Sequence, residues 1–245
     1  MSKRLLIGLT LLLASILCGQ QMPFIFVPGG PTNVRVLFQD HLGRLWVGGA
    51  TDVACFDGSR FYSLHDFGFP SVGVQVVTED TEGAIWIGSE VGVYRFAQGA
   101  LTRVMDGYVT ALAAASGIVI VSAGQESQGL RQQLFLSRIE RTSGGWNSDR
   151  VLENSYTEPF SLNQARTAVM LPGHEGWGQV AVHDIVSWRQ GMKLTIQQHS
   201  FPGGKQAPNG AGSGRYLEDR FSCVWSRNEL TTGFQCPGDP QPTFL

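Results

Sequence analysis

Three features of this sequence have residue types that can take part in catalysis. They are repeated carboxylates, histidine–acid pairs and a glycine-rich segment that contains a lysine. A carboxylate or a histidine can act as a general acid or base when it lies within hydrogen-bond reach of a substrate. Asp40, Asp80 and Asp219 occupy the same place in repeated segments. Because one active site does not need an acid in each repeat, we expect these residues to cap turns and support core packing.

The other motifs lack parts that their chemistry requires. His174-Glu175 begins like a zinc-binding His-Glu-x-x-His helix, but Gly178 stands where the second histidine would be. His65-Asp66 and His183-Asp184 have no Gly-x-Ser-x-Gly nucleophile elbow to serve, so we interpret them as surface turn residues. Gly203-Gly204-Lys205 lacks the remaining residues of a phosphate loop. We therefore expect no catalytic residue, no cofactor and no metal ligand.

Composition narrows the class of protein. The chain has 245 residues, of which 31 are glycine and 16% are charged. Typical soluble domains have about 7% glycine and about 25% charged residues, so many turns and few solvated helices are expected. The formal net charge of -2 gives no basic surface for phosphate contacts, and we expect no nucleic-acid partner. With 42% hydrophobic residues, the chain can bury a sizeable core.

The N-terminus has the pattern of an export signal. Lys3 and Arg4 precede an uncharged apolar stretch, residues 5–17, that is too short to span a bilayer comfortably. We predict a signal peptide over residues 1–19, cleaved after Gly19, and a periplasmic or extracellular location. Lipidation at Cys18 and an uncleaved N-terminal anchor are the alternatives, and membrane attachment is expected only through this segment.

Export changes the interpretation of the remaining cysteines, because disulfides persist outside the cytoplasm. Cys223 and Cys236 lie on two segments that we expect to be adjoining strands. A cross-strand disulfide and two buried free thiols are both compatible with this spacing, since a bridge also needs Cα atoms within about 7 Å. Cys55 is expected to be a small core residue rather than a nucleophile.

An internal repeat is the strongest pattern in the sequence. Residues 34–58 align without a gap with residues 74–98, 40 positions later. They share the pattern V-x-V-x-x-x-D-x-x-G-x-ϕ-W-ϕ-G, in which ϕ is aliphatic. A third, weaker copy lies near the C-terminus. The repeat residues are Asp40, Gly43 and Trp46, then Asp80, Gly83 and Trp86, and finally Asp219 and Trp225.

Each copy reads as a small antiparallel sheet. Residues alternate with period two before the Asp, and Asp and Gly occupy the first and fourth positions of a β-turn. The next strand is apolar on both faces and must be buried on both sides. Four short strands per repeat of this length are typical of a β-propeller blade. We predict an all-β fold, a β-propeller of about five four-stranded modules over residues 24–245. Five modules are compatible with a closed ring and with an incomplete one. The approximate modules are 33–73, 74–106, 107–153, 160–200 and 214–245.

Two segments test this assignment. The alanines of residues 111–115 favour helix, but the β-branched run 118–121 and the preceding Gly117 favour a strand, which we predict. From Thr167 onward, TAVMLPGHEGWGQVAVHDIVSW followed by KLTIQQHSF is expected to supply a further set of alternating strands.

The segments QDHLGRLWVGG and EDTEGAIWIGSEVGVYRF resemble the two-component regulator propeller repeat. The second copy matches this repeat from Glu79-Asp80 to Arg95-Phe96, whereas the first has Ala54-Cys55-Phe56 in place of the arginine segment. The resemblance implies the periplasmic sensing part of a hybrid histidine kinase or diguanylate cyclase. We expect a truncated form that lacks the output domain.

The leading hypothesis for function is an exported, non-enzymatic propeller that binds a ligand. The alternatives are an extracellular hydrolase or lyase acting on polysaccharide, and an envelope protein-interaction module. The partner is expected to be an unidentified small molecule, a glycan or a protein. Phe61, Tyr62, Phe67 and Phe69 are the candidate ligand-stacking residues, and the alternative for them is packing of an outer strand on the next blade.

Overall fold

The computed structural model describes residues 27–115, 117–125, 133–153, 160–163, 165–173, 176–200, 215–218, 224–227, 232–235 and 243–244. These residues form five four-stranded sheets, each an antiparallel meander in chain order. Sheet one consists of β1 (Val36–Gln39), β2 (Leu45–Gly48), β3 (Val53–Phe56) and β4 (Phe61–Ser63). Sheet two consists of β5 (Val74–Glu79), β6 (Ile85–Ser89), β7 (Gly92–Ala97) and β8 (Ala100–Asp106). Sheet three consists of β9 (Tyr108–Ala115), β10 (Ile118–Gln125), β11 (Gln133–Thr142) and β12 (Gly145–Glu153).

The last two sheets continue the same meander. Sheet four consists of β13 (Ser161–Leu162), β14 (Ala168–Gly173), β15 (Gly176–Ala181) and β16 (Gln197–Ser200). Sheet five consists of β17 (Arg215–Glu218), β18 (Val224–Arg227), β19 (Thr232–Gln235) and β20 (Thr243–Phe244). A short 3-10 helix, η1 (Leu64–Phe67), follows β4, and one helix, α2 (Val182–Ser187), follows β15. The described part of the chain contains no helix long and apolar enough to cross a membrane.

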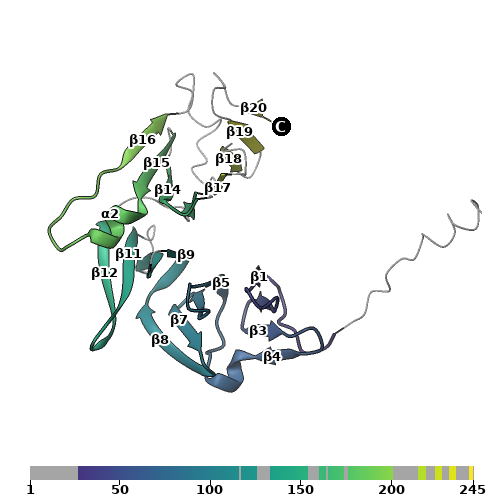
Figure 1. The fold of residues 1–245 in the computed structure, drawn as a ribbon. Helices are drawn as coiled ribbons and strands as arrows, with labels where there is room; N and C mark the ends of the chain where they lie inside the picture. The colour runs from purple at the N-terminus through teal and green to yellow at the C-terminus, as the bar shows by residue number, and fades with distance from the viewer. Residues whose placement is uncertain are drawn as a thin grey trace, which may run out of the picture.

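The five sheets follow one another around an arc, with sheet one at one end and sheet five at the other (Figure 1). The first strand of each sheet contacts the first strand of the next, from β1 to β5, β9, β13 and β17. Hydrophobic clusters fill the interfaces between sheets one and two, two and three, and three and four. This architecture confirms the predicted all-β propeller of four-stranded modules.

The second strand of sheet two shows why an uninterrupted apolar run forms a strand here. All five residues of β6 are buried. Ile85 and Ile87 pack in the cluster shared with sheet one, whereas Trp86 packs in the cluster shared with sheet three. Because successive side chains of a strand point to opposite faces, a strand between two neighbouring sheets buries both faces, which favours an apolar run such as Ile85-Trp86-Ile87.

The glycine that ends the Trp-ϕ-Gly motif permits close approach of the next sheet. A Cβ atom at Gly48 would lie 2.7 Å from Val74 Cγ1, and one at Gly88 would lie 2.6 Å from Val109 Cγ1. Val74 is the first residue of β5 and Val109 the second residue of β9, and these are the first strands of the following sheets. The repeat therefore needs glycine here because another strand crosses directly over its Cα atom.

Replacing Gly88 with alanine is expected to lower the free energy of unfolding by about 1–3 kcal/mol, because overpacking forces neighbouring strands apart. Gly144→Ala is the matched control, since a Cβ atom there would meet nothing within 4 Å. Urea denaturation of the two variants measures the difference. Equal stability of both variants would show that sheets two and three can separate without cost.

The alanine-rich segment forms a strand, as predicted, but the prediction for the segment after Thr167 is wrong at one point. Val182–Ser187 forms α2 instead of continuing a strand, and residues 193–196 precede β16 without strand structure. Val182 and Ile185, one helical turn apart, are both buried against the core between sheets three and four. This i, i+3 spacing is the helical period, whereas a strand would direct the two side chains to opposite faces.

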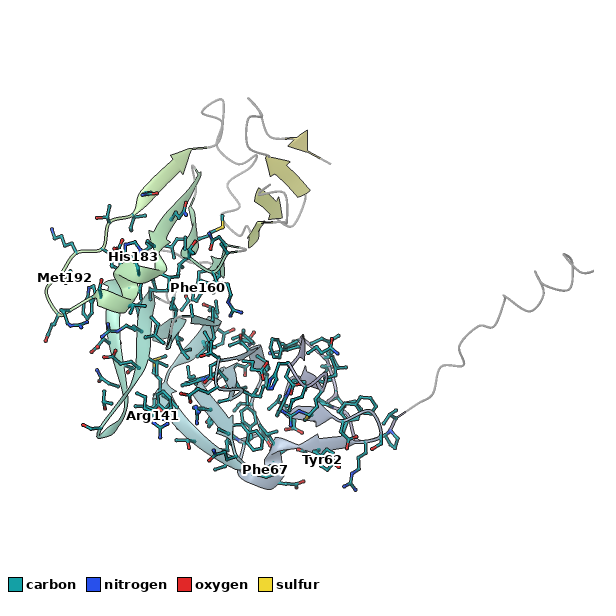
Figure 2. All side chains as sticks on the ribbon, in the orientation of Figure 1. Tyr62, Phe67, Arg141, Phe160, His183 and Met192 are labelled. Atoms are coloured by element: carbon teal, nitrogen blue, oxygen red, sulfur yellow. The ribbon has the colours of Figure 1, made fainter. Side chains whose placement is uncertain are left out.

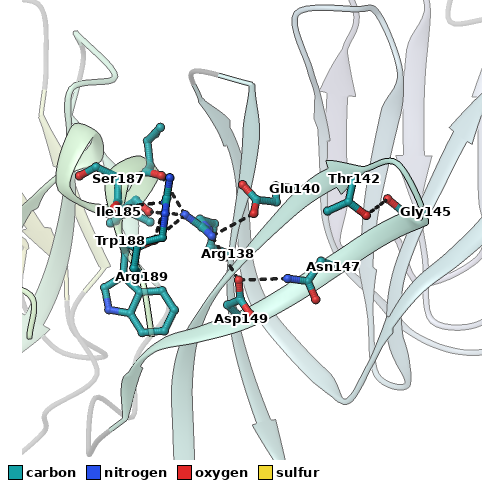
Figure 3. A network of polar contacts seen from close by, with 11 residues as sticks. Arg138, Glu140, Thr142, Gly145, Asn147, Asp149, Ile185, Ser187, Trp188 and Arg189 are labelled. Carbon is teal, nitrogen blue, oxygen red and sulfur yellow. Dashed lines mark hydrogen bonds and ion pairs between the residues drawn. The ribbon is translucent and has the colours of Figure 1, made fainter. Parts of the chain in front are cut away.

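One buried arginine joins sheet three to this helix. Arg138 of β11 is 3% exposed, and its guanidinium donates to the carbonyl oxygens of Val186 at 2.8 Å and Trp188 at 3.1 Å (Figure 3). It also donates to Glu140 Oε1 at 3.0 Å and Asp149 Oδ2 at 3.1 Å. The last carbonyls of a helix have no partner within the helix, and a cation there also favours the helix dipole. Arg138 therefore fixes the position of α2 against sheet three.

Candidate functional site

The repeated aspartate organises the first turn of sheet one. Asp40 Oδ1 accepts hydrogen bonds from the backbone N–H groups of Leu42 and Arg44, at 3.1 and 2.9 Å. Asp40 Oδ2 accepts from Arg44 Nε at 2.7 Å and from the indole Nε1 of Trp46 at 2.9 Å. Gly43, with φ of +81°, donates its N–H to the carbonyl oxygen of Asp40 and closes the turn. Both carboxylate oxygens are thus used within the sheet.

Sheet two repeats this arrangement. Asp80 Oδ1 accepts from the N–H groups of Glu82 and Ala84, both at 2.9 Å, and Oδ2 accepts from Trp86 Nε1 at 2.7 Å. Gly83 has φ of +80° and closes the turn in the same way. We call this unit, the carboxylate with its turn and the indole six residues later, the Asp–Trp lock. An aspartate with both oxygens engaged in this way has little capacity left to act on a substrate.

Of the two repeat residues predicted near the C-terminus, the structure describes only the backbone of Trp225. Trp225 lies in β18, where its backbone faces Leu217 of β17 and Phe234 of β19. Asp219, Cys223 and Cys236 lie outside the described residues, so the cross-strand disulfide and the pair of free thiols both stay open.

The lock in sheet one makes stability depend on pH. Burial alone raises the pKa of Asp40, but the hydrogen bonds from Trp46 and Arg44 outweigh it and hold the pKa below its ordinary value of 3.8. A carboxyl whose pKa is lower in the folded state stabilises the fold above its unfolded pKa and loses this contribution as the pH falls through the folded pKa. We therefore expect Asp40→Asn to lose less stability than the wild type when the pH is lowered through 3.8.

Urea midpoints measured at neutral and acidic pH would test this expectation, with Asp66→Asn at an exposed position as the control. The control should follow the wild-type pH dependence. If Asp40→Asn loses as much stability at acidic pH as the wild type, the pH dependence comes from other carboxyl groups.

The acidic residue before the lock joins neighbouring sheets. Glu79, at the end of β5 in sheet two, accepts a hydrogen bond from the backbone N–H of His41 at 2.9 Å and also pairs with the His41 ring. His41 follows Asp40 in the turn of sheet one. The Glu-Asp pair of the repeat thus has two structural uses, because Glu79 reaches back to the preceding sheet while Asp80 forms the lock of its own sheet.

The equivalent place between sheets two and three is a pocket. Its cavity volume is about 60 Å³, and we call it the Thr81 pocket. The residues that line it include Thr81, Trp86, Ala114, Ile118, Arg141 and Trp146. Among the described residues, no acceptor receives a hydrogen bond from the Thr81 N–H. Arg141 lies near the end of the long hairpin formed by β11 and β12 (Figure 2).

Two tryptophans and two arginines stack beside this pocket. The rings of Trp86 and Trp146 meet edge to face, with centroids 5.0 Å apart. The Arg95 guanidinium lies 5.1 Å from the Trp146 ring and 5.8 Å from the Trp86 ring, and that of Arg141 lies 5.9 Å from the Trp146 ring. Arg95 Nε is buried and has no hydrogen-bond partner among the described residues. Cation–π contacts hold these rings and cations together, and they place positive charge at the side of the pocket.

The four aromatic candidates do not share one surface. Phe69 is 3% exposed and packs against Tyr94, whereas Phe67 is 43% exposed and contacts Phe96 of sheet two. Phe61 packs on Phe56, and Tyr62 is 39% exposed beneath the Arg60 guanidinium. Figure 2 shows Tyr62 and Phe67 at the outer side of the arc.

The contacts of His65, His183 and Cys55 indicate structural roles. His65 Nε2 lies 3.6 Å from Asp52 rather than beside Asp66, and its Nδ1 contacts the carbonyl oxygen of Phe69. His183 pairs with the adjacent Asp184 at 2.9 Å on an exposed helix turn. Burial raises the pKa of the Cys55 thiol, which keeps it protonated and a poor nucleophile.

The pocket residues Thr81, Arg141 and Trp146 were missed as site residues by sequence reasoning. The signal that could have found them is the alanine run of β9, which stands where sheet two has Glu79-Asp80. Whether these alanines leave a pocket depends on which turn of the neighbouring sheet faces them. Only the arrangement of the sheets shows that this turn contains Thr81.

No protein-family model matches the chain, and no curated protein matches it. Among solved structures, the chain is similar to the extracellular domain of a putative hybrid two-component system of B. thetaiotaomicron, with a TM-score of 0.60 and 12% identity over 87% of this chain and 28% of that one. It is also similar to PorZ, a surface component of the type-IX secretion system of Porphyromonas gingivalis, with a TM-score of 0.60 and 16% identity over 91% of this chain and 36% of that one.

A propeller enzyme gives a similar match. The GH74 enzyme of Niastella koreensis has a TM-score of 0.55 and 12% identity, over 88% of this chain and 38% of that one. The chain therefore spans well under two thirds of the length of these structures. At such identities the likeness shows the fold, and sensors, secretion components and enzymes share it.

Proposed function

We propose that this protein is an exported, non-enzymatic β-propeller that binds a ligand, in the manner of the extracytoplasmic part of a two-component receptor. The observation that carries the proposal is the Thr81 pocket between sheets two and three, with its tryptophan rings and arginine guanidiniums. Concave sites that combine apolar and aromatic walls with a few polar groups are typical of small-molecule binding.

The use of the carboxylates supports binding over catalysis. Hydrolysis of a glycosidic bond usually needs a pair of carboxyl groups that can reach the scissile bond. In sheets one and two, Asp40 and Asp80 use both oxygens in their locks, and Glu79 is paired with His41. The likeness to the extracellular domain of a two-component system adds a precedent for this fold in a sensor.

A panel of soluble oligosaccharides and small metabolites, tested with the purified protein, separates the candidate functions. Binding is measured as a rise in melting temperature, and turnover as the appearance of reducing ends or unsaturated products. We expect at least one ligand to stabilise the protein without being consumed. Product formation would instead establish a polysaccharide hydrolase or lyase. Stabilisation by no member of the panel, together with a stoichiometric protein partner from periplasmic extract, would favour an envelope interaction module.

Export is tested separately by fractionation of cells that express the full chain. We expect the protein in the periplasmic or secreted fraction, and retention in the cytoplasm would overturn this part of the proposal.

A further inference from the structure

The first strands of sheets two and three occupy equivalent positions. Each has a buried valine as its first or second residue, Val74 or Val109, that lies over a glycine of the preceding sheet. Each also pairs with its second strand through a register shift directly after that valine. Five residues beyond these valines, sheet two has Glu79 and sheet three has Ala114. Ala114 therefore stands where the repeat places the glutamate that joins neighbouring sheets.

The loss of this glutamate explains why the pocket exists. Between sheets one and two, the Glu79 carboxylate fills the space beside the turn and accepts the His41 N–H. Between sheets two and three, Thr81 has the place of His41, directly after the lock aspartate. The methyl group of Ala114 cannot reach it, and both residues line the Thr81 pocket. The pocket is therefore the space that a carboxylate occupies at the preceding interface.

We propose that the Thr81 pocket binds a small carboxylate with a short apolar tail, whose carboxylate takes the place at Thr81 that Glu79 takes at His41. This inference rests on the proposed ligand-binding function and names the chemistry of the ligand. The Thr81 N–H and hydroxyl group supply donors, and the Arg141 guanidinium, which lines the same pocket, supplies the positive charge. Hydrogen bonds between charged groups of this kind are about twice as strong as neutral ones.

The walls of the pocket fit the apolar tail. Ala114, Val119 and Ile139 of sheet three line it, and their side chains belong to the buried cluster between sheets two and three. The volume of about 60 Å³ suits an anchoring group of a few heavy atoms rather than a whole sugar ring. A ligand larger than this would extend from the pocket mouth.

Two carboxylates that line the pocket, those of Asp80 and Glu82, do not prevent this binding. Asp80 has its oxygens engaged in the lock, with Arg95 Nε 3.9 Å away. Glu82 is 68% exposed and lies 3.5 Å from the Arg95 guanidinium. The preceding interface already holds two carboxylates around one turn, since Asp40 and Glu79 both accept hydrogen bonds from it.

The test follows the amide resonance of Thr81 in the full chain by NMR while sodium propionate is added. Propionamide, which has the same shape and no charge, is the control ligand. We expect a saturable shift of the Thr81 resonance with propionate and none with propionamide. Arg141→Gln is expected to weaken propionate binding about tenfold, because a charge-assisted hydrogen bond of roughly 1.5 kcal/mol is lost.

Ala114→Glu supplies the missing carboxylate from the protein itself. This variant should show the Thr81 resonance already shifted and should no longer respond to propionate. Ala100→Glu, which adds the same charge at an exposed position of β8, should respond as the wild type does. If Ala114→Glu does not fold, the propionamide comparison and the surface variant Arg141→Gln still decide the question.

The inference is overturned if Thr81 does not respond to propionate, responds equally to propionamide, or still responds in a folded Ala114→Glu protein. A ligand from the oligosaccharide and metabolite panel that binds without moving the Thr81 resonance would leave the proposed function in place and remove only this assignment of the pocket.

Discussion

Replacing Arg138 with leucine is expected to lower the free energy of unfolding by about 3–5 kcal/mol, the usual cost of removing one partner from a buried ionic network. The leucine would leave the carbonyl oxygens of Val186 and Trp188 without a donor, together with the partly buried carboxylates of Glu140 and Asp149. Urea denaturation followed by tryptophan fluorescence measures the loss. It would also report the surroundings of Trp188, whose ring the guanidinium approaches at 6.0 Å.

Arg141→Leu is the matched control, because it makes the same substitution at an exposed position of the same strand. We expect it to change stability by no more than about 0.5 kcal/mol, as surface substitutions usually do. Arg138→Lys should fall between the two, since one ammonium group cannot serve both the helix carbonyls and the two carboxylates. Single mutations lower the free energy of unfolding by about 1 kcal/mol on average. A smaller loss for Arg138→Leu would show that α2 is held by its apolar face alone.

Replacing Asp80 with alanine is expected to lower the free energy of unfolding by about 2–4 kcal/mol, because the substitution leaves a buried indole N–H and two turn N–H groups without acceptors. Its control is Glu82→Ala in the same turn, at a side chain that is 68% exposed. A double-mutant cycle with Trp86→Phe isolates the bond between the carboxylate and the indole. Additive effects of the two substitutions would contradict the Asp–Trp lock.

The repeat pattern was sufficient to predict the architecture. The aspartate, the glycine and the doubly apolar tryptophan strand each have a local physical cause, in turn geometry and in burial on both faces, so they could be interpreted without a structure. The strand at residues 111–115 was also predictable, since the β-branched residues after Gly117 outweigh the helix propensity of alanine.

The features that the sequence did not reveal depend on contacts between sheets. Arg138 lies far along the chain from the helix that it caps, and nothing local indicates that partner. The helix has only six residues, too few for its helical spacing of apolar residues to stand out as a period. The Thr81 pocket exists because Ala114 has no carboxylate at the position equivalent to Glu79. The missing carboxylate leaves a pocket only because a turn of sheet two faces that position.

The first three interfaces between sheets differ in the polar groups that join them, and this bears on how a chain of similar repeats avoids misassembly. Proteins with repeated modules characteristically misfold when a module associates with the wrong neighbour. Here the first interface pairs Glu79 with His41, the second has alanine at the glutamate position, and the third inserts Arg138 beneath a helix. A sheet placed out of order would bury a carboxylate or a guanidinium without its partner, so these unlike contacts specify the sequence in which the modules assemble.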